Sequence, residues 1–188
     1  MLRTRVGYAG GTTQNPTYHD LGDHAETVQI DFDPSRISYE KLLDIFWNSH
    51  DSARVSWSRQ YRAAVFYHNE EQRKLAEETR ARLALMTGRR IVTAIEPYSG
   101  FTIAEDYHQK HSLRLFSELM MEFKTMYPDT KSLINSTAVS HVNGYLGGYG
   151  SCESLQKEIE GFGLSHKARE GLISFVCGHK AKGECPIR

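Results

Sequence analysis

The most informative segment of the chain reads VGYAGGTTQNPTY over residues 6–18 and is followed by DHAE over residues 23–26. The β-branched and aromatic residues at its start predict a strand over residues 2–9. That strand should end at Gly10 and Gly11, because residues without a side chain permit a tight turn. The segment therefore presents a polar loop at the end of a strand.

Strand and helix patterns alternate through the next hundred or so residues. Alternation of apolar and polar residues predicts strands over residues 27–32, 62–68 and 91–95. Apolar residues at helical spacing predict helices over residues 39–47, 70–87 and 104–127, the first two behind Ser38 and Asn69 as N-caps. The third helix begins in the segment AEDYHQ, where we expect Tyr107 to turn inward. This order predicts helices packed on a mixed sheet.

The end of the chain differs in composition. Residues 143–151 hold four glycines in NGYLGGYGS, which predicts a flexible loop, and short helices are expected over residues 153–159 and 166–176. We therefore divide the chain into a catalytic domain over residues 1–142 and a glycine-rich, cysteine-containing tail over residues 143–188. All three cysteines lie in this tail, and their odd number argues against a disulfide-stapled secreted domain.

The charge balance argues against several classes of partner. Lys plus Arg and Asp plus Glu are equal at 23 each in 188 residues, so the composition offers no basic surface of the kind that binds nucleic acid. No apolar run is long enough to span a membrane, and the opening residues MLRTRVGYAGG fit neither a secretion signal nor a transit segment. We expect a cytoplasmic protein, with a mitochondrial location left open.

The segments at residues 6–18 and 23–26, together with RQYR at residues 59–62, resemble the A-type peptide methionine sulfoxide reductases. The resemblance implies an α+β fold, a two-layer sandwich with a mixed sheet. It implies thiol-dependent reduction of methionine (S)-sulfoxide in proteins or in the free amino acid, with no cofactor and no metal. It also implies a monomer that takes electrons from thioredoxin or another dithiol.

Reduction of a sulfoxide requires a nucleophile for sulfur, a proton for the departing oxygen and a pocket for the S-methyl group. In the family, a cysteine thiolate attacks sulfur and a second cysteine resolves the sulfenic acid that forms. The resemblance assigns the proton to Glu26, which we expect to be buried and therefore protonated to higher pH. It assigns hydroxyls that point at the substrate oxygen to Tyr18 and Tyr61, whose rings also wall the methyl pocket. We expect Trp57 on the rim of that pocket.

The chain departs from the family pattern at several positions. The family's nucleophilic cysteine lies in a Gly-Cys-Phe-Trp strand upstream of this block, whereas the sequence given begins with MLR. We therefore expect the first strand and the nucleophile to be missing, and the chain to bind without reducing if Met1 is its native start. Ser56 stands where the family has an aspartate. Leu146 occupies a position of a resolving cysteine, which leaves Cys152 as the candidate resolving thiol.

A non-catalytic binder is one alternative function. Such a protein would keep Tyr18, Glu26 and Tyr61 as a recognition pocket for oxidised methionine in peptides, and would not turn over for want of a thiol.

A metal-binding protein is the other alternative. His108 and His111 lie about one helical turn apart, and Cys177, His179 and Cys185 cluster near the end of the sequence. Thiolate and imidazole groups are zinc ligands, but these spacings match no strong zinc signature. Cys177 and Cys185 are also candidates for a second thiol relay pair.

Overall fold

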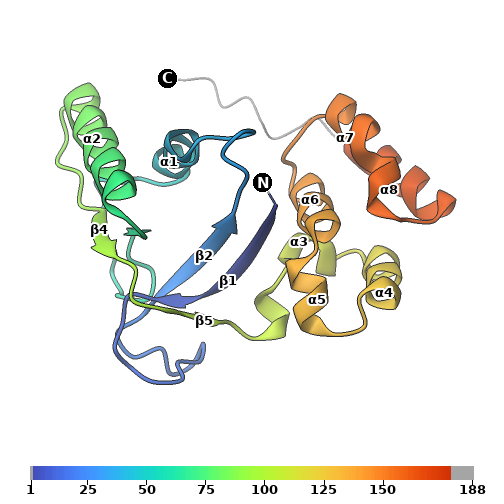
Figure 1. Cartoon of the computed structure of the whole chain (residues 1–188), viewed down its shortest axis with the longest axis horizontal. Helices are drawn as coiled ribbons and strands as arrows, with labels where there is room; N and C mark the ends of the chain where they lie inside the picture. The colour runs from blue at the N-terminus through green and yellow to red at the C-terminus, as the bar shows by residue number, and fades with distance from the viewer. Residues whose placement is uncertain (1, 179–188) are drawn as a thin grey trace. The chain divides into compact units, whose positions relative to one another are not determined.

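The computed structural model describes residues 2–178, which divide into two compact units. The first, which we call the sheet unit, is Val6–Glu105; the second, the helical unit, joins Leu2–Arg5 to the residues from Asp106 onward. In Figure 1 the sheet unit runs from blue to green and the helical unit from yellow to red. The boundary expected between residues 142 and 143 falls inside a helix of the helical unit, so the chain divides earlier than its glycines indicate.

The described strands form two small sheets (Figure 1). β1 (Arg3–Ala9) lies between β2 (Ala25–Asp31) and β5 (Phe101–Ile103) and runs antiparallel to β5. β3 (Ala64–Tyr67) pairs in parallel with β4 (Ala94–Pro97). The sequence did not predict β5, because three residues are too few to show an alternation. The α+β class is confirmed, and its parallel and antiparallel pairs lie in separate sheets of the described chain.

Two helices of the sheet unit begin at the residues that the sequence predicted. α1 (Tyr39–Asn48) is capped by the Ser38 hydroxyl, and α2 (Glu70–Thr87) is capped by the Asn69 side chain, which accepts from the backbone of Gln72 at 2.9 Å. α2 ends at Gly88, which adopts the left-handed conformation that glycine tolerates best.

These helices pack on the β3–β4 sheet through a small apolar cluster. Leu43 and Trp47 of α1 and Ala76 of α2 are buried against Val65 of β3. The indole of Trp47 also donates to the hydroxyl of Thr79 at 2.9 Å, which satisfies its polar group inside the cluster. The apolar faces of α1 and α2 therefore cover one sheet.

The turn after β1 needs glycine. Gly10 has a φ of +75°, and a Cβ atom there would lie 2.4 Å from the ring of Phe66. A side chain at this position would meet both a disfavoured backbone conformation and an aromatic ring. The expected exit of the chain at Gly10 is confirmed, and it starts the loop that carries Tyr18.

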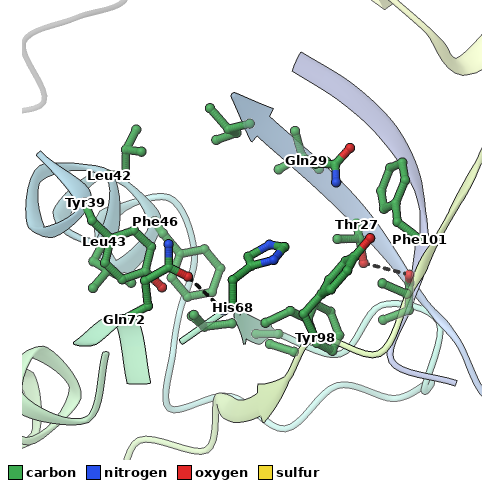
Figure 2. A pocket seen from close by; sticks show the side chains of 18 of the residues that line it. Thr27, Gln29, Tyr39, Leu42, Leu43, Phe46, His68, Gln72, Tyr98 and Phe101 are labelled. Carbon is green, nitrogen blue, oxygen red and sulfur yellow. Dashed lines mark hydrogen bonds between the residues drawn. The ribbon is translucent and has the colours of Figure 1, made fainter. Parts of the chain in front are cut away.

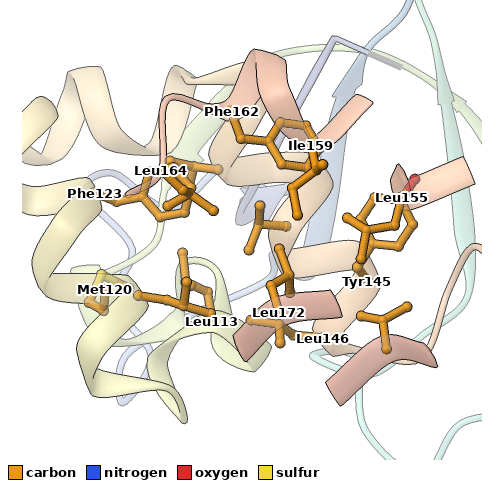
Figure 3. Close-up of a cluster of buried hydrophobic side chains, with 14 of the residues drawn as sticks. Leu113, Met120, Phe123, Tyr145, Leu146, Leu155, Ile159, Phe162, Leu164 and Leu172 are labelled. Atoms are coloured by element: carbon orange, nitrogen blue, oxygen red, sulfur yellow. The ribbon is translucent and has the colours of Figure 1, made fainter. Parts of the chain in front are cut away.

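The helical unit is built around one apolar cluster, shown in Figure 3. Its elements are η1 (Asp106–His108), α3 (His111–Arg114), α4 (Ser117–Met126), α5 (Thr130–Asn135), α6 (Thr137–Leu146), α7 (Cys152–Glu158), η2 (Ile159–Phe162) and α8 (His166–Gly178). Leu113, Phe123 and Leu155, which come from α3, α4 and α7, are each 0% exposed in this cluster. Within residues 2–178, no helix has both the length and the hydropathy that crossing a membrane requires.

The single helix expected over residues 104–127 is wrong. The segment is instead divided into η1, α3 and α4, and Lys110 between the first two has a φ of +53°, which no continuous helix accommodates. A second break falls at Phe116, whose backbone is not helical. Tyr107 was expected to turn inward and is 54% exposed. The apolar residues of this segment therefore belong to three short elements and not to one face of a single helix.

The first part of the flexible loop expected over residues 143–151 is instead the end of a helix. α6 continues to Leu146, and both Tyr145 and Leu146 are buried in the apolar cluster. Burial of these two side chains outweighs the cost of Gly144 inside the helix. The two short helices predicted beyond this point are confirmed as α7 and α8.

Lys110 is a buried cation of the helical unit. Its Nζ donates to the Thr4 carbonyl and to the Ser140 hydroxyl, each at 2.7 Å, and only 5% of the residue is exposed. Burial, with a smaller contribution from the charge of Arg5, lowers the pKa of Lys110 to about 8. The amine is therefore charged at neutral pH against the cost of desolvation.

We predict that the helical unit becomes more stable as the pH rises from about 8 towards 10.5. The folded-state pKa of Lys110 lies below its unfolded-state value, so in this window the unfolded chain binds more protons, and stability rises by at most about 1.4 kcal/mol per pH unit. The measurement is urea unfolding of the wild-type chain and of Lys110→Met across this range. A difference between the two chains that does not change with pH would contradict the prediction.

Candidate active site

Two tyrosines meet in the sheet unit. The hydroxyls of Tyr18, in the loop after β1, and Tyr61, just before β3, are 3.5 Å apart. Glu26 of β2 joins them through Gln60: the Glu26 backbone N–H donates to the Gln60 carbonyl at 2.9 Å, and the Gln60 amide donates to Glu26 Oε1 at 2.7 Å. We call Tyr18, Glu26, Gln60 and Tyr61 the oxygen site, because its side chains are able to hold an oxygen atom through hydrogen bonds.

The protonated phenol of Tyr61 is favoured in this setting. The hydrogen bond with Tyr18 raises the pKa of Tyr61 most, and partial desolvation and the negative charge of Glu26 raise it further. A phenol with a raised pKa remains a hydrogen-bond donor at neutral pH. The two hydroxyls therefore offer O–H donors to an acceptor placed between them.

Glu26 is not buried as expected. Ala25 is 1% exposed and faces the core, so the alternation of β2 turns the next side chain, Glu26, towards solvent. Its carboxylate is held by the Gln60 amide instead of by apolar neighbours. The structure thus brings Glu26 to the two tyrosines, but without the burial that was expected to keep it protonated.

Trp57 and Ser56 occupy the loop that leads to Tyr61. The Trp57 ring is 84% exposed and lies 5.3 Å from the Tyr61 ring, so it extends the aromatic surface beside the oxygen site. The Ser56 hydroxyl donates to the Ser58 carbonyl at 2.8 Å. Ser56, which stands where the family has an aspartate, therefore stabilises its own turn.

Glu105 supports the oxygen site and was missed by the sequence analysis. Its carboxylate accepts from the Tyr18 backbone N–H at 3.0 Å and from the Tyr8 hydroxyl at 2.5 Å. Asp106 and His108, which follow Glu105 in the same motif, belong to the helical unit. Glu105 lies two residues after β5, a strand that the sequence did not predict, so no sequence pattern pointed to this carboxylate.

The loop between β1 and β2 is fixed by two further side chains. The Asp23 carboxylate accepts from the backbone and hydroxyl groups of Thr12 and Thr13, and these bonds hold its pKa well below the usual range. His24 is 8% exposed, bonds the Thr13 carbonyl at 2.8 Å and accepts from the Gly11 N–H at 3.2 Å. The loop that carries Tyr18 is therefore an ordered support.

An apolar cavity of about 290 Å³ adjoins the oxygen site (Figure 2). The cavity is lined by Leu42 and Phe46 of α1, by Tyr98 just after β4 and by Phe101 of β5. Glu26 is also part of its wall. The ring of Tyr98 stacks on His68, with centroids 4.3 Å apart. This cavity provides apolar surface next to a cluster of oxygen-binding groups.

Cys152 and Cys177 form a disulfide in the helical unit, which joins α7 to α8. The pairing of Cys177 with Cys185 that the spacing suggested is not what the described residues show; Cys185 and His179 lie outside them. Leu146, at the position of a resolving cysteine, is a core residue. The partner of Cys152 is thus Cys177.

Metal binding finds no candidate site in residues 2–178. No group of three or more His, Cys, Asp or Glu side chains is placed there to hold an ion, and Cys177 is committed to the disulfide.

Comparisons with known proteins show which family this chain resembles. The family model described as peptide methionine sulfoxide reductase matches residues 1–137, and the model of the selenoprotein methionine sulfoxide reductase A helical domain matches residues 130–172. A Drosophila melanogaster peptide methionine sulfoxide reductase is 38% identical over 185 residues, which cover 97% of this chain and 74% of the relative. The MsrA protein of Methanothermobacter thermautotrophicus is 47% identical over 123 residues, which cover 59% of this chain and 72% of that protein.

Solved structures of two relatives share the fold. Mxr1 from Saccharomyces cerevisiae in reduced form has a TM-score of 0.53 at 28% identity, covering 56% of this chain and 66% of that one. Methionine sulfoxide reductase A of Corynebacterium diphtheriae has a TM-score of 0.50 at 29% identity, covering 59% and 62%. This chain thus spans slightly less than two thirds of each solved structure.

We predict that Glu105→Ala lowers the free energy of unfolding of the sheet unit by about 1–3 kcal/mol, because the buried Tyr8 hydroxyl loses its carboxylate acceptor. Urea unfolding measures this loss, with Glu78→Ala on the exposed face of α2 as the control. In a Tyr8→Phe background, Glu105→Ala should cause a smaller loss of unfolding free energy. An equal loss in both backgrounds would show that the bond between Tyr8 and Glu105 contributes nothing.

We predict that reduction of the Cys152–Cys177 disulfide lowers the stability of the helical unit by about 3–4 kcal/mol, since the bond closes a loop of roughly 25 residues in the unfolded chain. Urea unfolding with and without a phosphine reductant measures the effect. The double variant Cys152→Ser, Cys177→Ser should not respond to the reductant. If the reductant does not change the stability of the wild-type chain either, the stabilising role of the disulfide is contradicted.

Proposed function

Because this chain belongs to the peptide methionine sulfoxide reductase family, we propose that it takes part in thiol-dependent reduction of methionine (S)-sulfoxide, with the substrate oxygen bound between Tyr18 and Tyr61. The observation that carries this proposal is the approach of the two phenol hydroxyls to 3.5 Å beside Glu26. A sulfoxide oxygen has lone pairs for two O–H donors, whereas a thioether has no such acceptor. The site therefore distinguishes oxidised from reduced methionine.

The oxygen must leave as water, so it needs two protons. Overall, two thiols and a sulfoxide give a disulfide, a thioether and water, and one thiol forms the first bond to sulfur. In our proposal Tyr18 and Tyr61 polarise the S=O bond, and Glu26, which is exposed, takes up a proton from solvent and passes it to the oxygen as the bond breaks. The Gln60 amide holds Glu26 at the position where it does this.

Electrons enter through thiols. We propose that thioredoxin or another dithiol reduces the Cys152–Cys177 disulfide by thiol exchange, and that Cys152 serves as the resolving thiol. In support, the structure pairs these two cysteines and leaves Cys177 exposed, where an external thiolate is able to attack it. The reaction consumes one dithiol and returns one disulfide for each sulfoxide reduced.

A binder without turnover is the second candidate. One observation favours it: within residues 2–178, both cysteines form a single disulfide. The described part of the oxidised chain therefore has no free thiol to attack the sulfoxide. Binding and turnover therefore need separate assays. Thioredoxin-dependent loss of sulfoxide from a peptide, abolished in Cys152→Ser, supports the reductase; binding with no loss of sulfoxide supports the binder.

We predict that the chain binds a peptide containing methionine (S)-sulfoxide more tightly than the same peptide containing methionine. Tyr18→Phe and Tyr61→Phe should each weaken sulfoxide binding by about 1 kcal/mol, or roughly fivefold, because each removes one hydrogen-bond donor. Neither variant should change the affinity for the methionine peptide. Isothermal titration of both peptides measures these affinities and does not depend on a nucleophile.

Tyr149→Phe provides the matched control. Tyr149 is 72% exposed and belongs to the helical unit, so this change removes a hydroxyl far along the chain from the oxygen site. If Tyr18→Phe and Tyr61→Phe bind the sulfoxide peptide as well as Tyr149→Phe does, the assignment of the oxygen site is wrong.

A further inference from the structure

A second pocket of the sheet unit lies beside the aromatic surface of the oxygen site. It has a volume of about 340 Å³, and Arg54, Arg59 and Arg62 line it together with Trp57 and Val92. Its lining contains no aspartate and no glutamate. We call it the arginine pocket.

The three arginines differ in how their charge is used. Arg62 is bound through both terminal nitrogens by Glu96, at 2.6 and 2.7 Å, so a carboxylate already balances it. The guanidinium groups of Arg54 and Arg59 make no hydrogen bond or ion pair with any other part of the chain that the structure describes, and both residues are exposed. The pocket therefore carries two positive charges that contact no acid.

Nearby acids do not supply the missing partner. Asp51 is bound by Arg89 at 3.0 Å, and its pKa is lowered mainly by that contact and only slightly by Arg54. The pKa of Glu96 is lowered mainly by its contact with Arg62 and only slightly by Arg59. Each acid is already held by another arginine, so an anion that enters the pocket does not have to displace an ion pair.

Trp57 connects the arginine pocket to the oxygen site. Trp57 lines the pocket, and its ring lies 5.3 Å from the ring of Tyr61. Val55, which also lines the pocket, is 75% exposed, so the pocket has an accessible apolar wall. A peptide whose sulfoxide oxygen contacts Tyr61 is able to cross Trp57 and place a neighbouring group in the pocket.

We propose that the arginine pocket binds a carboxylate of the substrate that flanks the oxidised methionine. The proposal rests on the oxygen site described under the proposed function and adds a substrate class: acidic peptides. Guanidinium groups bind carboxylates through paired hydrogen bonds, which gives both charge and geometry. The carboxylate comes either from an aspartate or glutamate side chain or from the C-terminus of a peptide that ends in the sulfoxide.

The test uses titration of the whole chain with short peptides at low salt. One pair contains methionine (S)-sulfoxide with glutamate or glutamine two residues away and an amidated C-terminus. A second pair ends in the sulfoxide with a free or an amidated carboxyl group. We expect the carboxylate of at least one pair to strengthen binding about three- to tenfold, because two exposed ion pairs contribute modestly, and we expect added salt to remove the gain.

Variants assign the effect to the pocket. Arg54→Gln and Arg59→Gln should each reduce the gain and leave the affinity for the uncharged peptides unchanged, which also shows that the variants are folded. Arg82→Gln is the matched control, because Arg82 is an exposed arginine of α2 paired with Glu40, outside the pocket. It changes the net charge equally and should keep the gain in full.

The outcomes separate this proposal from the one on which it rests. A gain in the side-chain pair or in the C-terminal pair supports the pocket and identifies the source of the carboxylate. If uncharged sulfoxide peptides bind better than uncharged methionine peptides but no carboxylate adds affinity, or if Arg82→Gln loses as much gain as Arg54→Gln, the pocket proposal fails alone. If uncharged sulfoxide peptides show no advantage, the oxygen site fails.

Discussion

The hydrogen bond from the backbone of Glu26 to the carbonyl of Gln60, at 2.9 Å, ties β2 to the segment that precedes β3. The oxygen site depends on this tie, because Gln60 and Tyr61 are adjacent and Glu26 lies on β2. The Gln60 side chain donates a second hydrogen bond to Glu26, and together the two bonds fix the positions of the Glu26 carboxylate and the Tyr61 phenol. Two small sheets that share no strand thereby contribute to one site.

Tyr18, the remaining member of the oxygen site, is positioned by other contacts. Glu105 fixes the backbone of Tyr18, and the Asp23 carboxylate closes the loop on which Tyr18 lies. Arg62 adds a link, since it binds Glu96 and donates to the Gly10 carbonyl at 3.4 Å. Polar groups that are held in place in advance bind a substrate oxygen without paying to reorder the loop. The exposed side chains of the site are thus carried by a constrained backbone.

Sequence patterns predicted those parts of the chain in which local chemistry and tertiary contacts agree. Caps at Ser38 and Asn69 located α1 and α2, and the family motif brought Tyr18, Glu26 and Tyr61 together correctly. The patterns failed where packing overrides local preference. Tyr145 and Leu146 are helical because the core buries them, and Lys110 breaks a helix while it bonds Thr4, more than a hundred residues away in sequence. Long-range contacts of this kind, including those of Glu105 and the Cys152–Cys177 pair, leave no periodic signal.

The most direct test of the oxygen site observes the phenol groups themselves. With tyrosine labelled by ¹³C at the ring carbon that carries the hydroxyl, NMR resolves each phenol while a methionine (S)-sulfoxide peptide is titrated. The account predicts that the signals of Tyr18 and Tyr61, assigned from their phenylalanine variants, shift together with one dissociation constant, and that Tyr149 does not shift. Saturable binding of the sulfoxide with no change at Tyr18 and Tyr61 would contradict it.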